Sequence, residues 1–293
     1  MNLASSGWTP PDLRGRVAVV TGASQGVGRG IAEILGSCGA TVYAVARDTE
    51  RKLQLIAELV NESGGKGVAV CCDLRQDDEV ESLFDRVAAE TGRLDLLVNN
   101  AIGWSDRPSD PKARDDDPAG MVPLPLWRKP LYWWDGNFEK GIRIHVASCR
   151  FGIPLMLRAK AAGLVLFTSE LAVRDAEHVW DIVLDVRAHA TARLAEVLAA
   201  QLRPHGVCAA VLYPGWTRTE SMIAATLAGE YPLAHSIDDL NAKTVSPHFA
   251  GRAVALLAVD RQLRERSGST IIARRLALEL GFTDVDGTVP ERD

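Results

Sequence analysis

A glycine-rich turn between an apolar run and an amphipathic segment is the feature that most limits what this chain can fold into. Val17–Val20 predicts a strand, Thr21–Gly28 holds glycines at positions 22, 26 and 28, and Arg29–Cys38 predicts a helix. The first glycine permits a tight turn, the second lets backbone N–H groups approach a pyrophosphate, and the third lets the helix pack close to its strand. The helix amino terminus also favours anions. The pattern therefore predicts a nucleotide phosphate cradle over an ordinary connection.

Strand-like and helix-like segments alternate after this turn. Apolar runs predict strands over 41–46, 68–72, 94–98, 164–168, 207–213 and 270–273. Apolar residues at helical spacing predict helices over 53–60, 77–91, 138–158, 179–202 and 247–260. This alternation predicts an α/β fold, a Rossmann-like doubly wound parallel sheet of about seven strands with helices on both faces.

Two irregular stretches interrupt the alternation, 101–136 and the residues after Pro214-Gly215 up to about Ser246, yet no clean boundary divides the chain. Residues 1–293 are therefore predicted to form a single domain, with an inserted loop over 101–136 and a polar tail over 276–293. The inserted loop is rich in Pro and Asp and then in aromatic residues, namely Trp127, Tyr132, Trp133 and Trp134. Sheets of this kind bind ligands under long loops at the carboxyl ends of strands, which favours a substrate lid. An oligomer contact or a local hydrophobic plug is the alternative.

Composition limits the partners. The net charge is −5 and the Lys and Arg residues are scattered, which argues against nucleic acid or an anionic membrane as a partner. No apolar run is long enough to span a bilayer, and the amino terminus lacks the pattern of a signal peptide, so we expect a cytoplasmic protein. The histidines show no metal-ligand spacing. The five cysteines are expected to be buried small side chains: Cys38, Cys71, Cys72, Cys149 and Cys208.

The end of the second predicted strand indicates which cofactor the cradle prefers. Sites for NAD present a carboxylate here to the adenosine ribose, and that carboxylate would repel a 2′-phosphate. This chain instead has Ala46 followed by Arg47. A small residue followed by a guanidinium suits a phosphate, so NADP(H) is expected over NAD(H). The alternative for Arg47 is a solvated strand end.

Several motifs together resemble the short-chain dehydrogenase/reductase family. They are Thr21-Gly22-x-x-x-Gly26-x-Gly28, Asp73 after the third strand, Asn99-Asn100-Ala101, Pro214-Gly215-x-x-x-Thr219 and the tail 281–287, which is similar to that of one branch of the family. The usual glycine after Ala101 is Ile102 here. The resemblance implies a homodimer or homotetramer built on two long helices. It also implies a cofactor site made of Gly22, Ser24, Gln25, Gly26, Val27, Gly28, Arg47, Asp73, Leu74, Asn100, Ala101, Pro214, Gly215 and Thr219.

The same resemblance exposes a missing catalytic pair. Family members use a Tyr as proton donor and a Lys four residues later, with a Ser and an Asn that orient substrate and water. Alignment of residues 198–207 without a gap puts Leu184 at the Tyr position and Ala188 at the Lys position. Neither can donate a proton. Ser169 fits the family Ser, and His145 takes the place of the Asn.

Three functions remain open. The first is an NADP(H)-binding enzyme with non-standard catalysis on a small, polyketide-like molecule, such as cyclisation, dehydration or isomerisation, with Ser169, His145 and Asp185 as acid–base candidates. The second is a carbonyl reductase or alcohol dehydrogenase that takes its proton from water, His145 or Tyr132. The third is a catalytically silent NADP(H)-binding or scaffold protein. Asp185 would alternatively form a solvated i,i+4 pair with His189, and Ser169 and His145 would be satisfied structural residues.

Overall fold

A single seven-stranded sheet with strand order β3-β2-β1-β4-β5-β6-β7 organises the computed structural model. The structure describes residues 8–47, 50–102, 124–159, 162–172, 179, 181–231, 234–260 and 262–290. Every pair of neighbouring strands is parallel, which confirms the predicted Rossmann-like fold. The strand order reverses between β1 and β4, so a ligand site is expected at their carboxyl ends. The strands are β1 (Val17–Thr21), β2 (Thr41–Ala46), β3 (Lys66–Cys71), β4 (Leu96–Asn99), β5 (Gly163–Thr168), β6 (Val207–Tyr213) and β7 (Thr270–Ile272).

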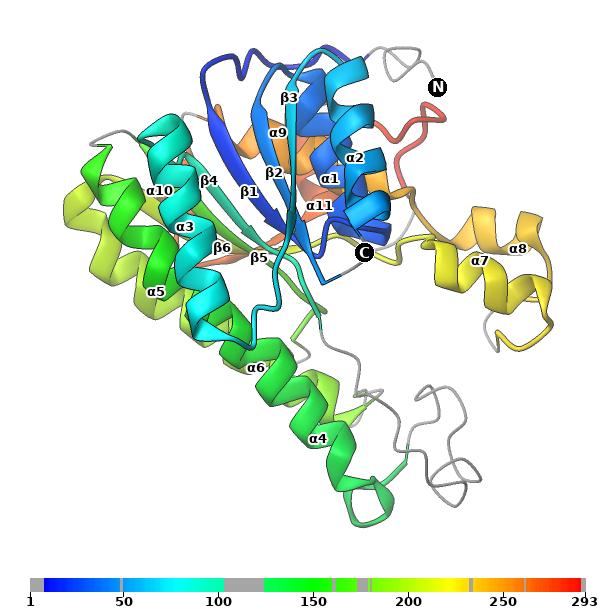
Figure 1. Ribbon diagram of the computed structural model, residues 1–293. Helices are drawn as coiled ribbons and strands as arrows, with labels where there is room; N and C mark the ends of the chain where they lie inside the picture. Colours follow the sequence, from blue (N-terminus) through cyan, green and yellow to red (C-terminus); the bar gives the residue numbers. More distant parts are fainter. Residues whose placement is uncertain are drawn as a thin grey trace.

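Helices cover both faces of the sheet (Figure 1). Every residue of β1 is buried, as is typical of a parallel strand enclosed on two sides. The helices on one face are α1 (Gly26–Ser37), α2 (Glu50–Glu62), α9 (Pro247–Leu257) and α11 (Ala273–Leu280). Those on the other are α3 (Asp77–Thr91), α5 (Arg143–Arg158) and α6 (Ile182–Leu202). Shorter elements are η2 (Leu126–Arg128), α4 (Leu131–Asn137), η3 (Phe138–Ile142), η5 (Arg203–His205), α7 (Glu220–Leu227), α8 (Ile237–Lys243) and α10 (Leu263–Arg266).

Close contact between α1 and α9 fixes the helix that follows the glycine-rich turn. A Cβ on Gly30 would lie 2.3 Å from the carbonyl carbon of Pro247, and one on Gly251 would lie 2.6 Å from the carbonyl oxygen of Gly30. Real Cβ atoms do not approach backbone atoms this closely, so the two helices touch only because both positions are glycine. The packing holds the amino terminus of α1 at the carboxyl edge of the sheet.

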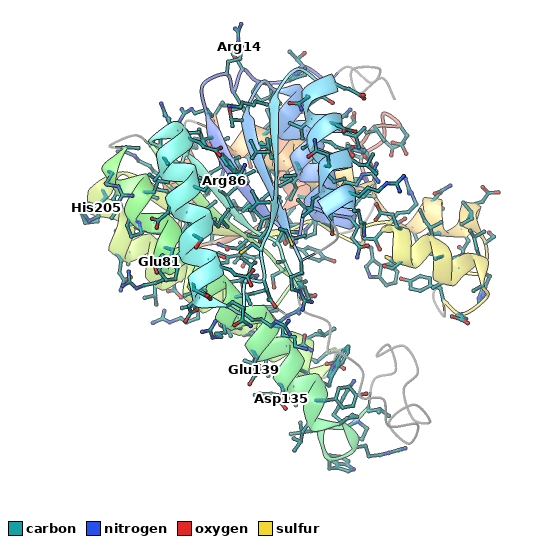
Figure 2. The ribbon with its side chains drawn as sticks, viewed as in Figure 1. Arg14, Glu81, Arg86, Asp135, Glu139 and His205 are labelled. Carbon is teal, nitrogen blue, oxygen red and sulfur yellow. The ribbon has the colours of Figure 1, made fainter. Side chains whose placement is uncertain are left out.

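The helix predicted over 138–158 begins earlier than expected. Helix α4 continues through the π-helical turn η3 into α5, and this extension projects beyond the sheet (Figure 1). Asp135 and Glu139 lie exposed on it (Figure 2). Residues 103–123 of the predicted lid lie outside the described residues, and its aromatic part is helical rather than a loop. The aromatic segment Leu131–Asn137 can be helical because no proline lies inside it and Pro130 stands just before its first turn.

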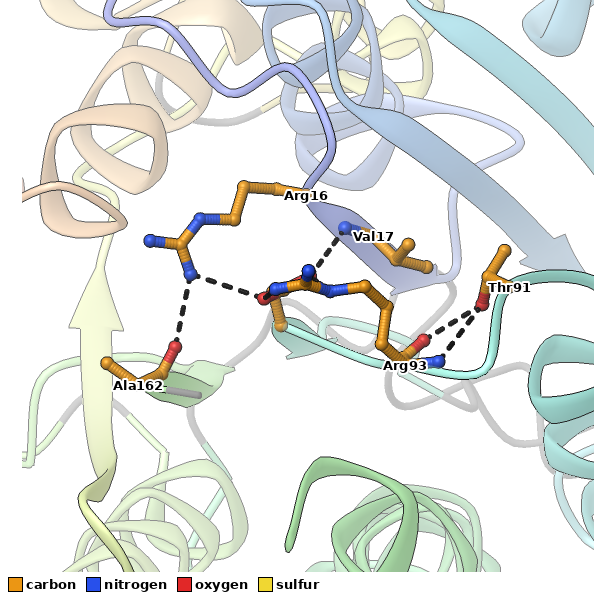
Figure 3. A network of polar contacts seen from close by, with 6 residues as sticks. Arg16, Val17, Thr91, Arg93 and Ala162 are labelled. Atoms are coloured by element: carbon orange, nitrogen blue, oxygen red, sulfur yellow. Dashed lines mark hydrogen bonds and ion pairs between the residues drawn. The ribbon is translucent and has the colours of Figure 1, made fainter. Parts of the chain in front are cut away.

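A buried carboxylate joins the amino ends of two strands, at the sheet edge opposite the ligand site (Figure 3). Asp95 Oδ2 accepts hydrogen bonds from Val17 N at 2.9 Å and from Arg93 Nε at 2.9 Å, and Arg16 Nη1 lies 3.2 Å from Oδ1. The Asp95 side chain is fully buried, so the two arginines offset its desolvation. This edge therefore has a structural role.

Three sequence predictions need correction. The tail from residue 276 was expected to be a polar loop, but its first residues belong to α11. They are helical because Leu276 and Ala277 are buried in the core. The irregular stretch before 246 contains α7 and α8, each with a side-chain cap at its amino terminus. Cys71 is exposed, because β3 is an edge strand and Cys71 is its last residue, whereas the other four cysteines are buried as predicted.

Candidate active site

A cleft of about 700 Å³ lies at the carboxyl ends of β1, β2, β3 and β4. It brings together eleven of the fourteen residues expected at the cofactor site: Gly22, Ser24, Gln25, Gly26, Val27, Arg47, Asp73, Leu74, Asn100, Ala101 and Thr219. Gly28 lies directly beneath the loop. Pro214 and Gly215 line a second cavity of about 1030 Å³ between β6, α8 and the tail, so the structure does not place them in this cleft.

The glycine-rich turn leaves no room for side chains on its inner side. A Cβ on Gly28 would lie 2.3 Å from the carbonyl oxygen of Gly22 and 2.4 Å from Asn100 Nδ2. Gly22 has φ +66°, and a Cβ there would lie 2.8 Å from Ala101 Cα. The positive φ and the close backbone approach both require glycine. The turn therefore carries no side chain at Gly22 or Gly28, as the close approach of a phosphate needs.

Hydrogen bonds from β4 and β5 hold this turn in place. Asn100 Nδ2 donates to the carbonyl oxygen of Thr21 at 3.0 Å, and Asn100 Oδ1 accepts from Thr168 Oγ1 at 3.0 Å. Thr21 Oγ1 accepts from the backbone N–H groups of Asn100 and Ala101. These contacts explain the Asn99-Asn100-Ala101 motif physically, because Asn100 connects three strands beneath the cradle.

Charged side chains surround the cleft near the ends of β2 and β3. Arg75 Nε donates to Asp73 Oδ1 at 2.9 Å, and this contact lowers the pKa of Asp73, so the carboxylate is ionised at neutral pH. Lys140 also lines the cleft, from the π-helical turn η3. Lys140 was not predicted from the sequence, because no residue pattern marks a π-helical turn and Lys140 is far from the cradle in the chain.

The positions of the expected Tyr and Lys lie on α6, which also carries a buried arginine. Ala188 is buried and Leu184 is half-buried. Arg187, which precedes Ala188 in the chain, is buried. Its Nη1 donates to Asn137 Oδ1 at 2.9 Å, and its guanidinium forms an ion pair with Glu170. A Cβ on Gly141 would lie 3.2 Å from Arg187 Cδ, so the π-helical turn makes room for this side chain.

His145 is buried and neutral at physiological pH. Its Nε2 lies 3.1 Å from the carbonyl oxygen of Ala101, so Nε2 carries the proton and donates it. Burial lowers the pKa of His145 to about 4, the Arg187 guanidinium also lowers it, and the Glu170 carboxylate opposes the shift. His145 is therefore a neutral imidazole at pH 7, and its Nε2–H holds the loop after β4.

Four buried polar atoms near the ends of β4 and β5 have no hydrogen-bond partner among the described residues. They are Ser169 Oγ, Glu170 Oε2, His145 Nδ1 and Asn99 Oδ1. Buried polar groups are rarely left unpaired, and such atoms gather at catalytic and binding sites. Glu170 was missed in the sequence analysis. Its position directly after Ser169 was a usable signal, although nothing in the sequence pointed to its pairing with Arg187.

The remaining candidates lie outside this group. Asp185 Oδ2 is 3.3 Å from His189 Nδ1, which is the i,i+4 pair considered as its alternative. Trp133 is buried with Lys129 Nζ 5.5 Å from its ring centroid, and Lys129 forms a buried ion pair with Asp181 at the amino terminus of α6. Lys129 therefore connects the aromatic segment to the amino terminus of α6.

The other lid aromatics differ in exposure. Trp134 stacks on Phe138 with ring centroids 4.2 Å apart, Trp127 is 86% exposed and Tyr132 is half-buried. A role for them in covering substrate stays a prediction.

Comparison with known proteins identifies the family. The family model of short chain dehydrogenases matches residues 16–121. The chain is 34% identical to dehydrogenase/reductase SDR family member 1 of Mus musculus over 94% of this chain and 85% of that protein, and 32% identical to its Homo sapiens counterpart over the same shares. The chain belongs to the short-chain dehydrogenase/reductase family. The expected resemblance to one branch of the family is also confirmed, since both relatives match this chain over most of its length.

A solved structure of this family supports the fold alone. A short chain dehydrogenase of Mycobacterium thermoresistibile superposes with a TM-score of 0.76 at 21% identity, covering 96% of this chain and 93% of that one. Within the part of the chain that the structure describes, we find no helix long and apolar enough to cross a membrane. The chain thus has the oxidoreductase scaffold of the short-chain dehydrogenase/reductase family.

Proposed function

We propose that this short-chain dehydrogenase/reductase is an NADP(H)-binding enzyme that acts on a small, polyketide-like molecule by non-standard proton transfer. The observation that carries the proposal is the cleft, which is lined by the glycine-rich turn and by Arg47. The expected Tyr and Lys positions, on α6, hold Leu184 and Ala188. Bound NADP(H) would supply or accept a hydride. The bare backbone of the cradle would hold its pyrophosphate, and Arg47 would pair with its 2′-phosphate.

The choice of NADP(H) rests on Arg47. This side chain is exposed at the carboxyl end of β2 and lines the cleft, and the residue before it is the small Ala46. Asp73, the nearest acidic residue of the cleft, is paired with Arg75, which reduces its repulsion of a phosphate. The adenosine end of the cleft therefore favours an extra phosphate.

Changing Arg47 to Ala is expected to weaken NADPH binding by about tenfold to a hundredfold while NADH binding changes little, because a charge-assisted contact to phosphate is lost. Titration calorimetry with both dinucleotides measures this. Arg203→Ala, an exposed arginine in η5, is the matched control and should leave both affinities unchanged. Equal loss for NADPH and NADH would contradict the role of Arg47, and no binding of either by the wild type would favour the scaffold alternative.

Proton transfer is assigned to Ser169 and Glu170. The Glu170 carboxylate would take the proton from a substrate hydroxyl, which leaves a neutral acid and a substrate alkoxide, and the reverse step would return the proton. Arg187 holds one carboxylate oxygen and leaves Oε2 unpartnered among the described residues. Ser169 Oγ would orient the substrate oxygen. His145 would keep the loop after β4 in position.

Glu170→Gln is expected to lower kcat by about 10²–10⁴-fold, because the amide cannot accept the proton, while it leaves NADPH affinity unchanged. NADPH oxidation and product formation are followed with a panel of small carbonyl and hydroxylated polyketide-like compounds. Glu139→Gln, on the exposed helical extension, is the control (Figure 2). Full turnover in Glu170→Gln together with loss in Ser169→Ala would move the proton transfer to Ser169.

A homodimer or homotetramer through α5 and α6 belongs to the same proposal. Val146, Ile182 and Val186 are exposed on these helices, by 46%, 37% and 37% respectively. Apolar side chains on neighbouring long helices favour helix-to-helix association. A cytoplasmic location stays a prediction from the sequence.

A further inference from the structure

A carboxylate of the chain itself reaches the amino terminus of α1. The backbone N–H of Gly26, the first residue of α1, donates to Glu220 Oε2 at 2.8 Å. Arg29 Nη1 lies 3.5 Å from Glu220 Oε1. Both Gly26 and Glu220 line the cleft. The first backbone N–H groups of a helix are where a phosphate group binds, so Glu220 already uses part of the cradle proposed for the dinucleotide.

The start of α7 is packed so that Glu220 can reach the cradle. Thr219 caps α7, with its Oγ1 accepting from Met222 N, and the next residue of the chain is Glu220. A Cβ on Gly26 would lie 3.1 Å from Thr219 Cγ2, so α7 begins directly against the glycine turn. A residue other than glycine at position 26 would force the two apart.

Glu220 is nevertheless free to leave. Its side chain is 47% exposed, and the long glutamate stem can rotate into water at little cost. Arg29 would keep a partner, because it also binds Glu33 with an Nε–Oε1 distance of 2.7 Å. Helices α7 and α8 stand to one side of the sheet (Figure 1) and have a small hydrophobic cluster of their own, made of Tyr231, Ala234 and Leu240.

We propose that Glu220 is a displaceable internal anion that competes with the pyrophosphate of the dinucleotide for the amino terminus of α1. This inference rests on the proposed function, since it concerns the same cleft. Two anions cannot share one set of N–H donors, and their mutual repulsion adds to the competition. Glu220 thereby lowers the affinity for the dinucleotide and favours its release. It also satisfies the cradle when the cleft holds no ligand.

Titration of NADPH into the Glu220→Gln variant tests the competition. We expect the Kd to fall about fivefold, because a neutral amide leaves the donors more readily and does not repel phosphate. Glu220→Asp should also bind more tightly, since the shorter carboxylate does not reach Gly26 N. Glu230→Gln removes the same charge from an exposed position between α7 and α8 and should leave the Kd unchanged.

A second probe separates the cradle from general electrostatics. Adenosine 2′-monophosphate lacks the pyrophosphate, so it should bind the wild type and Glu220→Gln equally. Equal or weaker NADPH binding in Glu220→Gln, with normal binding by the wild type, would overturn the competition alone. An equal gain for adenosine 2′-monophosphate would overturn it as well. Failure of all proteins to bind any dinucleotide would overturn the proposed function, whereas binding by Glu220→Gln alone would support both proposals.

Discussion

Replacing Asp181 with alanine is expected to lower the free energy of unfolding by about 3–5 kcal/mol, the largest stability effect that this structure predicts outside the core. Asp181 caps α6, with Oδ1 accepting from Val183 N at 2.9 Å and Leu184 N at 3.0 Å. The same carboxylate forms a buried ion pair with Lys129, whose side chain is 3% exposed. Alanine would remove the cap and leave a buried ammonium without its counter-charge.

Matched variants separate the cap from the ion pair. Asp181→Asn keeps an acceptor for the two backbone N–H groups and should cost less than Asp181→Ala, and adding Lys129→Met should recover part of the loss. Ser236→Ala removes the cap of α8, where Ser236 Oγ accepts from Asp239 N, and should cost about 1 kcal/mol because no buried charge is involved. Urea unfolding followed by circular dichroism measures all four. A loss at Asp181→Ala equal to that at Ser236→Ala would contradict the role of the ion pair.

Gly28→Ala is expected to weaken NADPH binding more than about a hundredfold, the largest effect on binding that we predict. The added methyl group would clash with the turn, and a change of side-chain rotamer cannot relieve the clash. Its Cβ would lie 2.3 Å from the carbonyl oxygen of Gly22 and 2.4 Å from Asn100 Nδ2. The first contact is backbone and the second is the amide that connects β1, β4 and β5, so neither can move without moving the turn.

The control for Gly28→Ala is a glycine with an unfavourable backbone conformation and open space around it. Gly15 has φ +76° and no heavy atom within 4 Å of the position that a Cβ would take, so Gly15→Ala should cost about 1 kcal/mol of stability and leave NADPH affinity unchanged. Thermal unfolding and calorimetric titration of both variants provide the comparison. Wild-type affinity in a folded Gly28→Ala protein would show that the cradle tolerates a side chain and would remove the steric argument.

Periodic and local patterns explain which parts of the fold were predictable. The buried strands β1, β2 and β6 appear in the sequence as apolar runs, and α3 ends at Gly92 with φ +67°, as its glycine predicts. Helices α7 and α8 and the start of α11 were missed because they are short, and their few apolar residues give little periodicity. The residues between Leu131 and Phe138 were predicted as loop because their aromatic side chains resemble a lid.

Long-range pairing explains which parts of the site were not predictable. The cradle was found because Gly22, Gly26 and Gly28 lie within one turn of chain, and each is required there by backbone geometry. Arg187, Asn137 and Glu170 are separated by up to 50 positions and meet only because α4, α6 and the end of β5 pack together. No spacing rule relates such residues. The same holds for Glu220, which is 194 positions from the Gly26 N–H that it accepts from.

The amino-acid pattern alone predicted the order of the seven strands, the glycine cradle and the absence of a Tyr and Lys at positions 184 and 188, because each depends on residues that are close in the chain. Only the tertiary structure decided what surrounds them. Packing buries His145 and lowers its pKa to about 4, so that its imidazole is neutral at pH 7. Packing also pairs Arg187 with Glu170, the residue that follows Ser169. Burial and electrostatic interaction depend on distances through space, and those distances are set only when the helices close on the sheet.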